Sequence, residues 1–373
     1  MTALRIVRAA LPGVALVLLA GCVSRGPLLE PLVAESGAAQ VELDDTPFFP
    51  QQQYQCGPAA LATVLASAGV AVTADSLVPE VYLPGRRGSL QPELAATTRR
   101  HDRVPYVLPQ SPDALFDTVA GGLPVLVLQK LGGGPWPGWH YAVLVGYDTA
   151  RDEVVLRSGT ERRRTLSASH FLATWDRADR WAMTALRPGV VPPSADFSRY
   201  MEAVASLEAV GRRDAAEPGY EAAARQWPDE ALPRFALANL AYARGDLVAA
   251  EQGFREAARL DPTDAAARNN RADVLRELGC LSAARREIER ARVLAAGTAL
   301  SGTVEATART IHRRRRPFDI DLLSDSAVSA RTTTSFLFTS TNPPLVAYTR
   351  SFPEGSFTVS LPISNSERNG AWS

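Results

Sequence analysis

The sequence predicts an α+β domain over residues 46–190, followed by an all-α solenoid of repeats over residues 197–298. In the first region, apolar residues at helical spacing alternate with short continuous apolar runs, which are typical of buried strands. In the second region the sequence repeats itself every 34 residues, which indicates stacked helical units. A length of 373 residues also indicates two or three domains rather than one.

The composition is that of an ordinary globular protein, with 46% hydrophobic and 21% charged residues. The formal net charge is zero, so bulk charge does not favour nucleic acid, and we expect no nucleic-acid partner. Nearly every basic residue is arginine, so the run over residues 313–316 is weak evidence for a binding patch. The three cysteines, an odd number, argue against a disulfide framework; they are Cys22, Cys56 and Cys280.

Residues 1–22 have the features of a targeting segment: two arginines, then an apolar run too short to span a bilayer as a helix. The run ends in Leu-Ala-Gly-Cys, which resembles the bacterial lipobox, so Cys22 is expected to be lipidated as the first residue of the mature chain. A plain secretory signal or a buried apolar strand is the alternative.

The residue after Cys22 is Val23 rather than Asp, which resembles the outer-membrane address of Gram-negative lipoproteins. We therefore expect a chain that is lipid-anchored to the bacterial outer membrane and faces the periplasm. Residues 23–45 have few aromatic residues and no clear period, and we interpret them as a tether between the membrane and the first domain.

The first domain is predicted to begin with a helix from Cys56 that ends at Gly69, with Pro58 well suited to a first turn. After this helix we expect a short polar and proline-rich region. A second helix, with Ser89 as its N-cap, is expected to end near Arg100. Further helices are expected over residues 113–120 and 169–175, and strands over residues 125–128, 140–148, 153–157 and 181–186.

The repeat region shows five separate registers of 34 residues, which matches the tetratricopeptide pattern and predicts three helix pairs. Repeat solenoids present an extended concave surface, so we expect these repeats to bind a protein or peptide partner. Residues 299–373 are poorly patterned and are expected to be weakly ordered. The registers are Gly211, Gly245 and Gly279; Ala216, Ala250 and Ala284; Tyr220, Phe254 and Ile288; Ala223, Ala257 and Ala291; and Pro228 and Pro262.

The chemistry of the first domain is expected at Cys56, which lies where a loop turns into a helix. The helix dipole and the free N–H groups of the first turn favour an anion there, so we expect a lowered thiol pKa and a reactive thiolate. A small buried cysteine without chemistry is the alternative.

A thiol nucleophile needs a base, and His140 is the candidate because it opens an apolar strand after a glycine-rich loop. His101, His170 and His312 lie in polar, helical or arginine-rich surroundings and fit surface roles. Cys56 and His140 have no third and fourth ligand at metal-site spacing, so no metal and no other cofactor is expected.

The two blocks Gln-Tyr-Gln-Cys-Gly-Pro-Ala-Ala-Leu and Gly-Trp-His-Tyr-Ala-Val-Leu-Val-Gly-Tyr-Asp resemble the papain-like cysteine peptidases that process double-glycine leaders of bacteriocins. The resemblance covers residues 46–190 and implies an α+β papain-like cysteine peptidase domain, followed here by the tetratricopeptide-repeat solenoid. It implies a peptide or protein substrate, Cys56 as nucleophile, His140 as base, and Gln51 as a donor to the oxyanion.

The third position departs from the family, which places Asp or Asn on the next strand, whereas this sequence has Ser158. Asp148 and Asp152 at the nearby turn are alternatives for orienting His140. Two functions therefore stay open. The first is a membrane-anchored cysteine peptidase, and the second is a non-catalytic peptide-binding lipoprotein with a peptidase-like groove.

Overall fold

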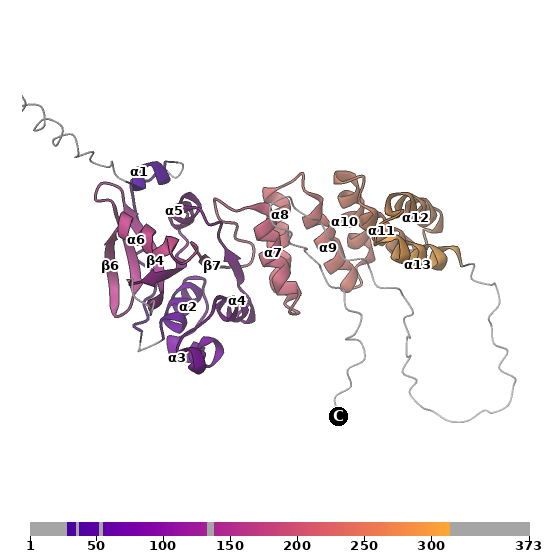
Figure 1. Cartoon of the computed structure of the whole chain (residues 1–373). Helices are drawn as coiled ribbons and strands as arrows, with labels where there is room; N and C mark the ends of the chain where they lie inside the picture. Colours follow the sequence, from indigo (N-terminus) through magenta and orange to yellow (C-terminus); the bar gives the residue numbers. More distant parts are fainter. Residues whose placement is uncertain (1–27, 35–36, 52–54, 133–137, 314–373) are drawn as a thin grey trace, which may run out of the picture. The chain divides into compact units, whose positions relative to one another are not determined.

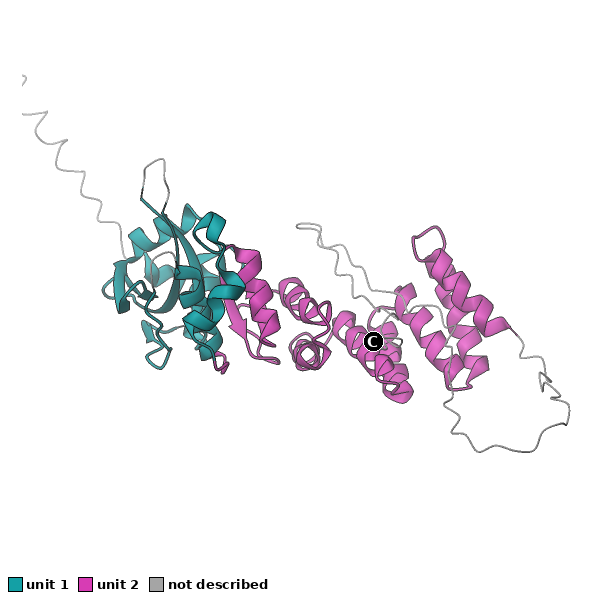
Figure 2. Cartoon of the chain, turned by 90° about the horizontal axis from the view of Figure 1, so that it is seen from below, with its two compact units in different colours: residues 1–67, 72–89, 108–182 teal, residues 68–71, 90–107, 183–373 magenta. Residues whose placement is uncertain are grey.

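The structure is a computed structural model that describes residues 28–34, 37–51, 55–132 and 138–313. The predictions for the signal segment, for Cys22 and for the tail beyond residue 313 lie outside the described residues. The chain divides into two compact units (Figure 2), which are described separately below. Unit 1 comprises residues 1–67, 72–89 and 108–182, and unit 2 comprises residues 68–71, 90–107 and 183–373.

The centre of unit 1 is an antiparallel sheet in the order β3-β4-β5-β6, with β1 paired to the end of β4. The middle of β4 is buried over residues 141–147, because it is apolar throughout and is covered on both faces. Gly146 is required there, since a Cβ would collide with the carbonyl oxygen of Val41 in β1. The strands are β1 (Gln40–Glu42), β3 (Val125–Leu131), β4 (Gly138–Asp148), β5 (Glu153–Ser158) and β6 (Glu161–Ser167).

Helix α2 (Cys56–Ser67) packs against β4 and carries the candidate nucleophile on its first residue. It ends as predicted before Gly69, whose φ of 81° is the left-handed conformation that favours glycine. The sequence analysis missed α3 (Ala74–Val81), which starts with a capping box between Thr73 and Ser76. The 3-10 helix η1 (Pro84–Arg86) and the helices α5 (Pro112–Ala120) and α6 (Ala168–Asp176) complete this part.

The segment expected to be a tether is folded over its described residues. Helix α1 (Leu29–Leu32) buries Leu29, and strand β1 pairs with β4. Asp152, in the turn after β4, accepts the backbone N–H groups of Leu28 and Leu29 at 2.9 and 3.0 Å. Both elements are too short to show a period, which is why the sequence pattern did not reveal them.

Unit 2 begins with α4 (Gln91–Arg100) and the antiparallel pair of β2 (Val104–Val107) and β7 (Ala182–Leu186). The prediction of Ser89 as a helix cap is wrong: the N-cap of α4 is Leu90, with no side-chain cap. Strand β2 was missed because it contains Pro105, and proline lowers the expectation of a strand.

The predicted repeats are present as three antiparallel helix pairs, which follow one another in Figure 1. The glycines at 211, 245 and 279 have φ values of 80°, 82° and 79°, so each permits the same turn inside a pair. The repeated alanines and the Tyr220, Phe254 and Ile288 positions are all fully buried, as small-against-large packing requires. The helices are α7 (Phe197–Glu208), α8 (Arg213–Gln226), α9 (Ala231–Ala243), α10 (Leu247–Leu260), α11 (Ala265–Glu277) and α12 (Leu281–Ala295).

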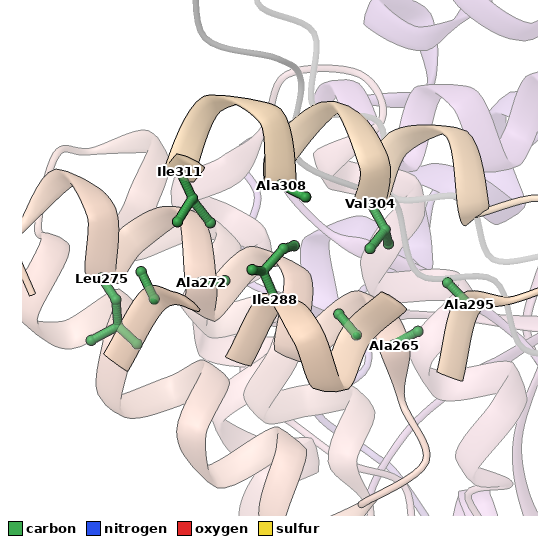
Figure 3. Packing of buried hydrophobic residues seen from close by; sticks show 10 residues of the cluster. Ala265, Ala272, Leu275, Ile288, Ala295, Val304, Ala308 and Ile311 are labelled. Atoms are coloured by element: carbon green, nitrogen blue, oxygen red, sulfur yellow. The ribbon is translucent and has the colours of Figure 1, made fainter. Parts of the chain in front are cut away.

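The expectation of a weakly ordered region from residue 299 is wrong at its start, because α13 (Ser301–His312) packs on α12 and α11. Figure 3 shows Val304, Ala308 and Ile311 of α13 directed toward Ile288 of α12. The helix thus covers the apolar face that a last repeat would otherwise leave exposed. Among the helices of the described residues, none has the length and apolar character needed to cross a bilayer.

Candidate active site

Cys56 lies at the first residue of α2, partly shielded from solvent. Its thiol is hydrogen-bonded by the backbone N–H groups of Tyr141, Gly57 and Cys56 itself. Burial raises the pKa of the thiol above its ordinary value, and it outweighs these backbone donors, which lower the pKa. The expectation of a lowered pKa is therefore corrected: the helix terminus supplies donors, and desolvation still disfavours the thiolate.

His140 lies near the start of β4, one residue before the amide that contacts the thiol. Its ring atom Nε2 is 2.8 Å from the hydroxyl Oγ of Ser158, at the end of β5. The β4–β5 hairpin brings these two ends together because the strands are antiparallel.

The two alternative partners of His140 lie at the opposite end of the same hairpin. Asp148 accepts the backbone N–H of Arg151 at 3.1 Å, and Asp152 holds the start of α1. Of the three residues considered, Ser158 is therefore the one that the structure places against the imidazole.

The pKa of His140 is lowered to about 4, first by burial and second by the positive charge of Arg164. The thiol pKa of Cys56 is raised and the imidazole pKa of His140 is lowered, so both side chains are expected to be uncharged at neutral pH. The two shifts favour a neutral thiol and a neutral imidazole at rest over a thiolate–imidazolium ion pair. Such a base can accept a proton during a reaction, at the cost of making two charges in a partly buried site.

Gln51 is fixed close to these residues by its backbone N–H, which donates to the carbonyl oxygen of Gly159 at 3.1 Å. Gln51, Cys56 and Ser158 line one small pocket, so the structure brings together the candidates from three separate segments. The rest of the lining consists of Phe48, Phe49, Ala59, Ala60, Thr63, Tyr141, Arg157 and Gly159.

Sequence reasoning missed two arginines near the site. Arg157 is 5% exposed, lines the pocket, and donates to the carbonyl oxygens of Arg162, Leu43 and Asp44. Leu43 and Asp44 lie at the start of the domain, so Arg157 ties the segment before Gln51 to β5. Arg164 of β6 lowers the pKa of His140. A single arginine in a short strand carries no local signal for either role.

The remaining candidates lie elsewhere in the described residues. Cys280 is exposed in the repeat region, and His170 is exposed on α6, as expected for a surface residue. Within the described ranges, no group of three His, Cys, Asp or Glu side chains is arranged to hold a metal ion.

The N-terminal domain matches the model of one protein family. Residues 43–183 match the model of the Peptidase_C39 like family, so the N-terminal part of the chain is a C39-like domain. The repeats that follow are tetratricopeptide-like. No curated protein matches the sequence.

Three solved structures are each similar to a part of the chain. A putative C39-like peptidase from Bacillus anthracis is 18% identical, with 40% of this chain and 98% of that chain covered and a TM-score of 0.34. The Yersinia enterocolitica type III secretion chaperone SycD, in complex with a peptide of the translocator YopD, is 20% identical (32% and 94% covered, TM-score 0.30). The TPR2B domain of yeast Sti1 is 15% identical (31% and 98% covered, TM-score 0.29).

Proposed function

We propose that this chain is a cysteine peptidase that hydrolyses peptide bonds through Cys56 and His140. The observation that carries the proposal is the grouping of a thiol at a helix start with a strand histidine held by Ser158, inside a domain that matches the Peptidase_C39 like family. The papain-like character of the site and the catalytic roles of the residues are part of the proposal.

In the proposed reaction, Nε2 of His140 donates to Ser158, which leaves Nδ1 to take the proton of the Cys56 thiol. The thiolate sulfur attacks the carbonyl carbon of the scissile bond. The negative oxygen that forms is stabilised by the backbone N–H of Cys56 and by the side-chain amide of Gln51. His140 then gives its proton to the leaving amine, and water hydrolyses the thioester to release the acid and the free thiol.

Two features of the site favour a second function, a peptide-binding lipoprotein without catalysis. The hydroxyl of Ser158 carries no charge and stabilises an imidazolium less than a carboxylate does. Both the thiol and the imidazole are also neutral at rest. Under this alternative, the same groove holds a peptide and releases it unchanged.

The test of the proposal is cleavage of a mixed peptide library by the wild type and by Cys56→Ala, His140→Ala and Ser158→Ala. Hydrolysis is expected to vanish in Cys56→Ala and to fall nearly as far in His140→Ala, because members of a catalytic unit act together. A folded wild type that binds library peptides without cutting any of them would favour the alternative.

The same proposal places the protein at the outer membrane, facing the periplasm, through lipid on Cys22. Replacement Cys22→Ser is expected to release the full chain from membrane pellets, since acyl chains contribute about 0.8 kcal/mol per buried CH₂. A variant that still sediments with membrane at high salt would remove the lipid-anchor part of the proposal.

The repeats are proposed to recruit a protein or peptide partner through their concave face. The full chain with Cys56→Ala is expected to capture a partner. This capture should be lost when residues on the concave face of the repeats are replaced. A partner that is retained despite such replacements would assign recruitment to the C39-like domain instead.

A further inference from the structure

Arg164 shares a face of the sheet with the His140–Ser158 pair. In the β5–β6 ladder, Leu156 pairs with Arg164 and Ser158 pairs with Glu161. Paired residues in antiparallel strands project to the same side, and Leu156 and Ser158, two apart, project to the same side as each other. Glu161 is therefore directly opposite Ser158, and Arg164 lies farther along β6 on the same side of the sheet, where its charge acts on His140.

The three arginines of β6 are engaged in different ways. Arg163 is bound through two nitrogens to the carboxylate of Glu42, both at 2.9 Å, and Arg162 donates to the carbonyl oxygen of Asp44 at 3.4 Å. Arg164 has an ion pair with Glu161 whose atoms are 3.8 Å apart, with side chains 42% and 60% exposed. An exposed pair at that distance contributes little, so Arg164 keeps most of its capacity to bind another anion.

The positive charge of Arg164 acts on the site without compensation from the third position. The resemblance implies Asp or Asn where this chain has the uncharged Ser158. The charge that His140 experiences is accordingly that of Arg164, which contributes to its lowered pKa after burial. A negative group brought in by a ligand would find a fork of guanidinium donors that is held only by the exposed, 3.8 Å ion pair with Glu161.

We propose that Arg164 selects substrates that carry an aspartate or glutamate beside the scissile bond, by pairing its guanidinium with that carboxylate. The inference rests on the proposed function and names its substrate class. Arginine suits this role because its planar donors match a carboxylate in two parallel hydrogen bonds. The substrate carboxylate also supplies, next to the imidazole, the negative charge that Ser158 does not provide.

Binding to the full chain with Cys56→Ala tests the proposal without requiring hydrolysis. The probes are labelled octapeptides with an alanine and serine background and Glu, Gln or Lys at each of the four central positions. At one position at least, the Glu peptide is expected to bind roughly tenfold more tightly than its Gln partner, since a charge-assisted bond is worth about that ratio. The preference should fall to less than about twofold when Arg164→Gln is added.

Two further variants distinguish direct recognition by Arg164 from an effect of the net positive charge of β6. Arg164→Glu is expected to reverse the preference, so that the Lys peptide binds more tightly than the Glu peptide. Arg163→Gln removes the same charge from the neighbouring residue, which is tied to Glu42, and should leave the preference for Glu intact. Equal loss in the Arg163 and Arg164 variants, or no Glu preference at all, would overturn the proposal.

Cleavage of the same peptides by the wild type tests the peptidase activity separately from the proposed role of Arg164. A Glu preference in binding without any cleavage would support the role of Arg164 and contradict the peptidase. Cleavage of Gln and Glu peptides at equal kcat/KM would support the peptidase and contradict the role of Arg164.

Discussion

The side chains of His140 and Ser158 meet at 2.8 Å, through ring atom Nε2 and hydroxyl Oγ. The contact engages Nε2 of the ring, and Nδ1 is the atom to which we assign the chemistry with Cys56. Because the Ser158 hydroxyl is neutral, it can orient the imidazole ring, but it stabilises the charge of an imidazolium less than a carboxylate does.

Replacing Ser158 tests that separation. Ser158→Ala should lower kcat/KM by about three- to tenfold, because a single neutral hydrogen bond is worth about 0.5–1.5 kcal/mol. Ser158→Asp should raise the His140 pKa above about 4 and increase kcat, since a carboxylate stabilises the imidazolium. The measurements are pH profiles of kcat/KM for the three proteins. An Asp variant with an unchanged acidic limb would show that Ser158 does not act on the ring.

The raised thiol pKa predicts how Cys56 reacts with iodoacetamide. The thiolate is the reactive form, and burial keeps its fraction small until the pH exceeds the ordinary thiol range. In a Cys22→Ser protein, Cys56 should therefore label more slowly than the exposed Cys280 at pH 7, and its rate should climb with pH. Peptide mapping by mass spectrometry gives both rates in one sample. Fast labelling of Cys56 at pH 5 would instead indicate a thiolate–imidazolium pair at rest.

Helix α13 should stabilise the repeat helices on which it packs, α11 and α12. Ile311 of α13 is 2% exposed and lies in the cluster with Leu275 and Ile288. Ile311→Ala is expected to lower the free energy of unfolding by about 2–5 kcal/mol, the range for a buried isoleucine truncated to alanine. Arg309→Ala, on the exposed side of the same helix, is the matched control and should change it little. Comparable midpoints in urea for both variants would contradict a covering role.

Asp152 should hold the start of α1 onto the rest of unit 1. It accepts two backbone N–H groups of α1, and its own φ of 52° is one that Asp and Asn tolerate. Asp152→Ala is expected to expose the segment around Leu29 to limited proteolysis. Asp152→Asn keeps an acceptor oxygen and the same backbone preference, so it should remain mostly protected. Protection of the segment in Asp152→Ala would show that burial of Leu29 alone is sufficient.

The parts of the fold that can be predicted from the sequence are those whose pattern lies within one continuous segment or recurs along the chain. The helix at Cys56, the strand at His140 and the position of Ser158 follow from apolar period and family spacing, and each lies where expected. The repeat glycines and alanines reveal themselves because three copies reinforce one signal.

What the sequence does not predict depends on contacts between distant segments. Asp152 bonds Leu29 across 123 residues, and no local pattern encodes that pairing. The direction of the Cys56 pKa shift likewise depends on how deeply the fold buries the thiol, which outweighs the favourable helix terminus. The side of β6 on which Arg164 lies is set by an irregularity in the β5–β6 register that only the structure reveals.

The most direct test of the central proposal is acid-quench mass spectrometry of the full chain mixed with an activated peptide ester. The account predicts a transient adduct with the mass of the acyl group on Cys56, formed by the wild type, much slower in His140→Ala and absent in Cys56→Ala. Peptide hydrolysis that proceeds without an adduct, and equally well in Cys56→Ala, would contradict it.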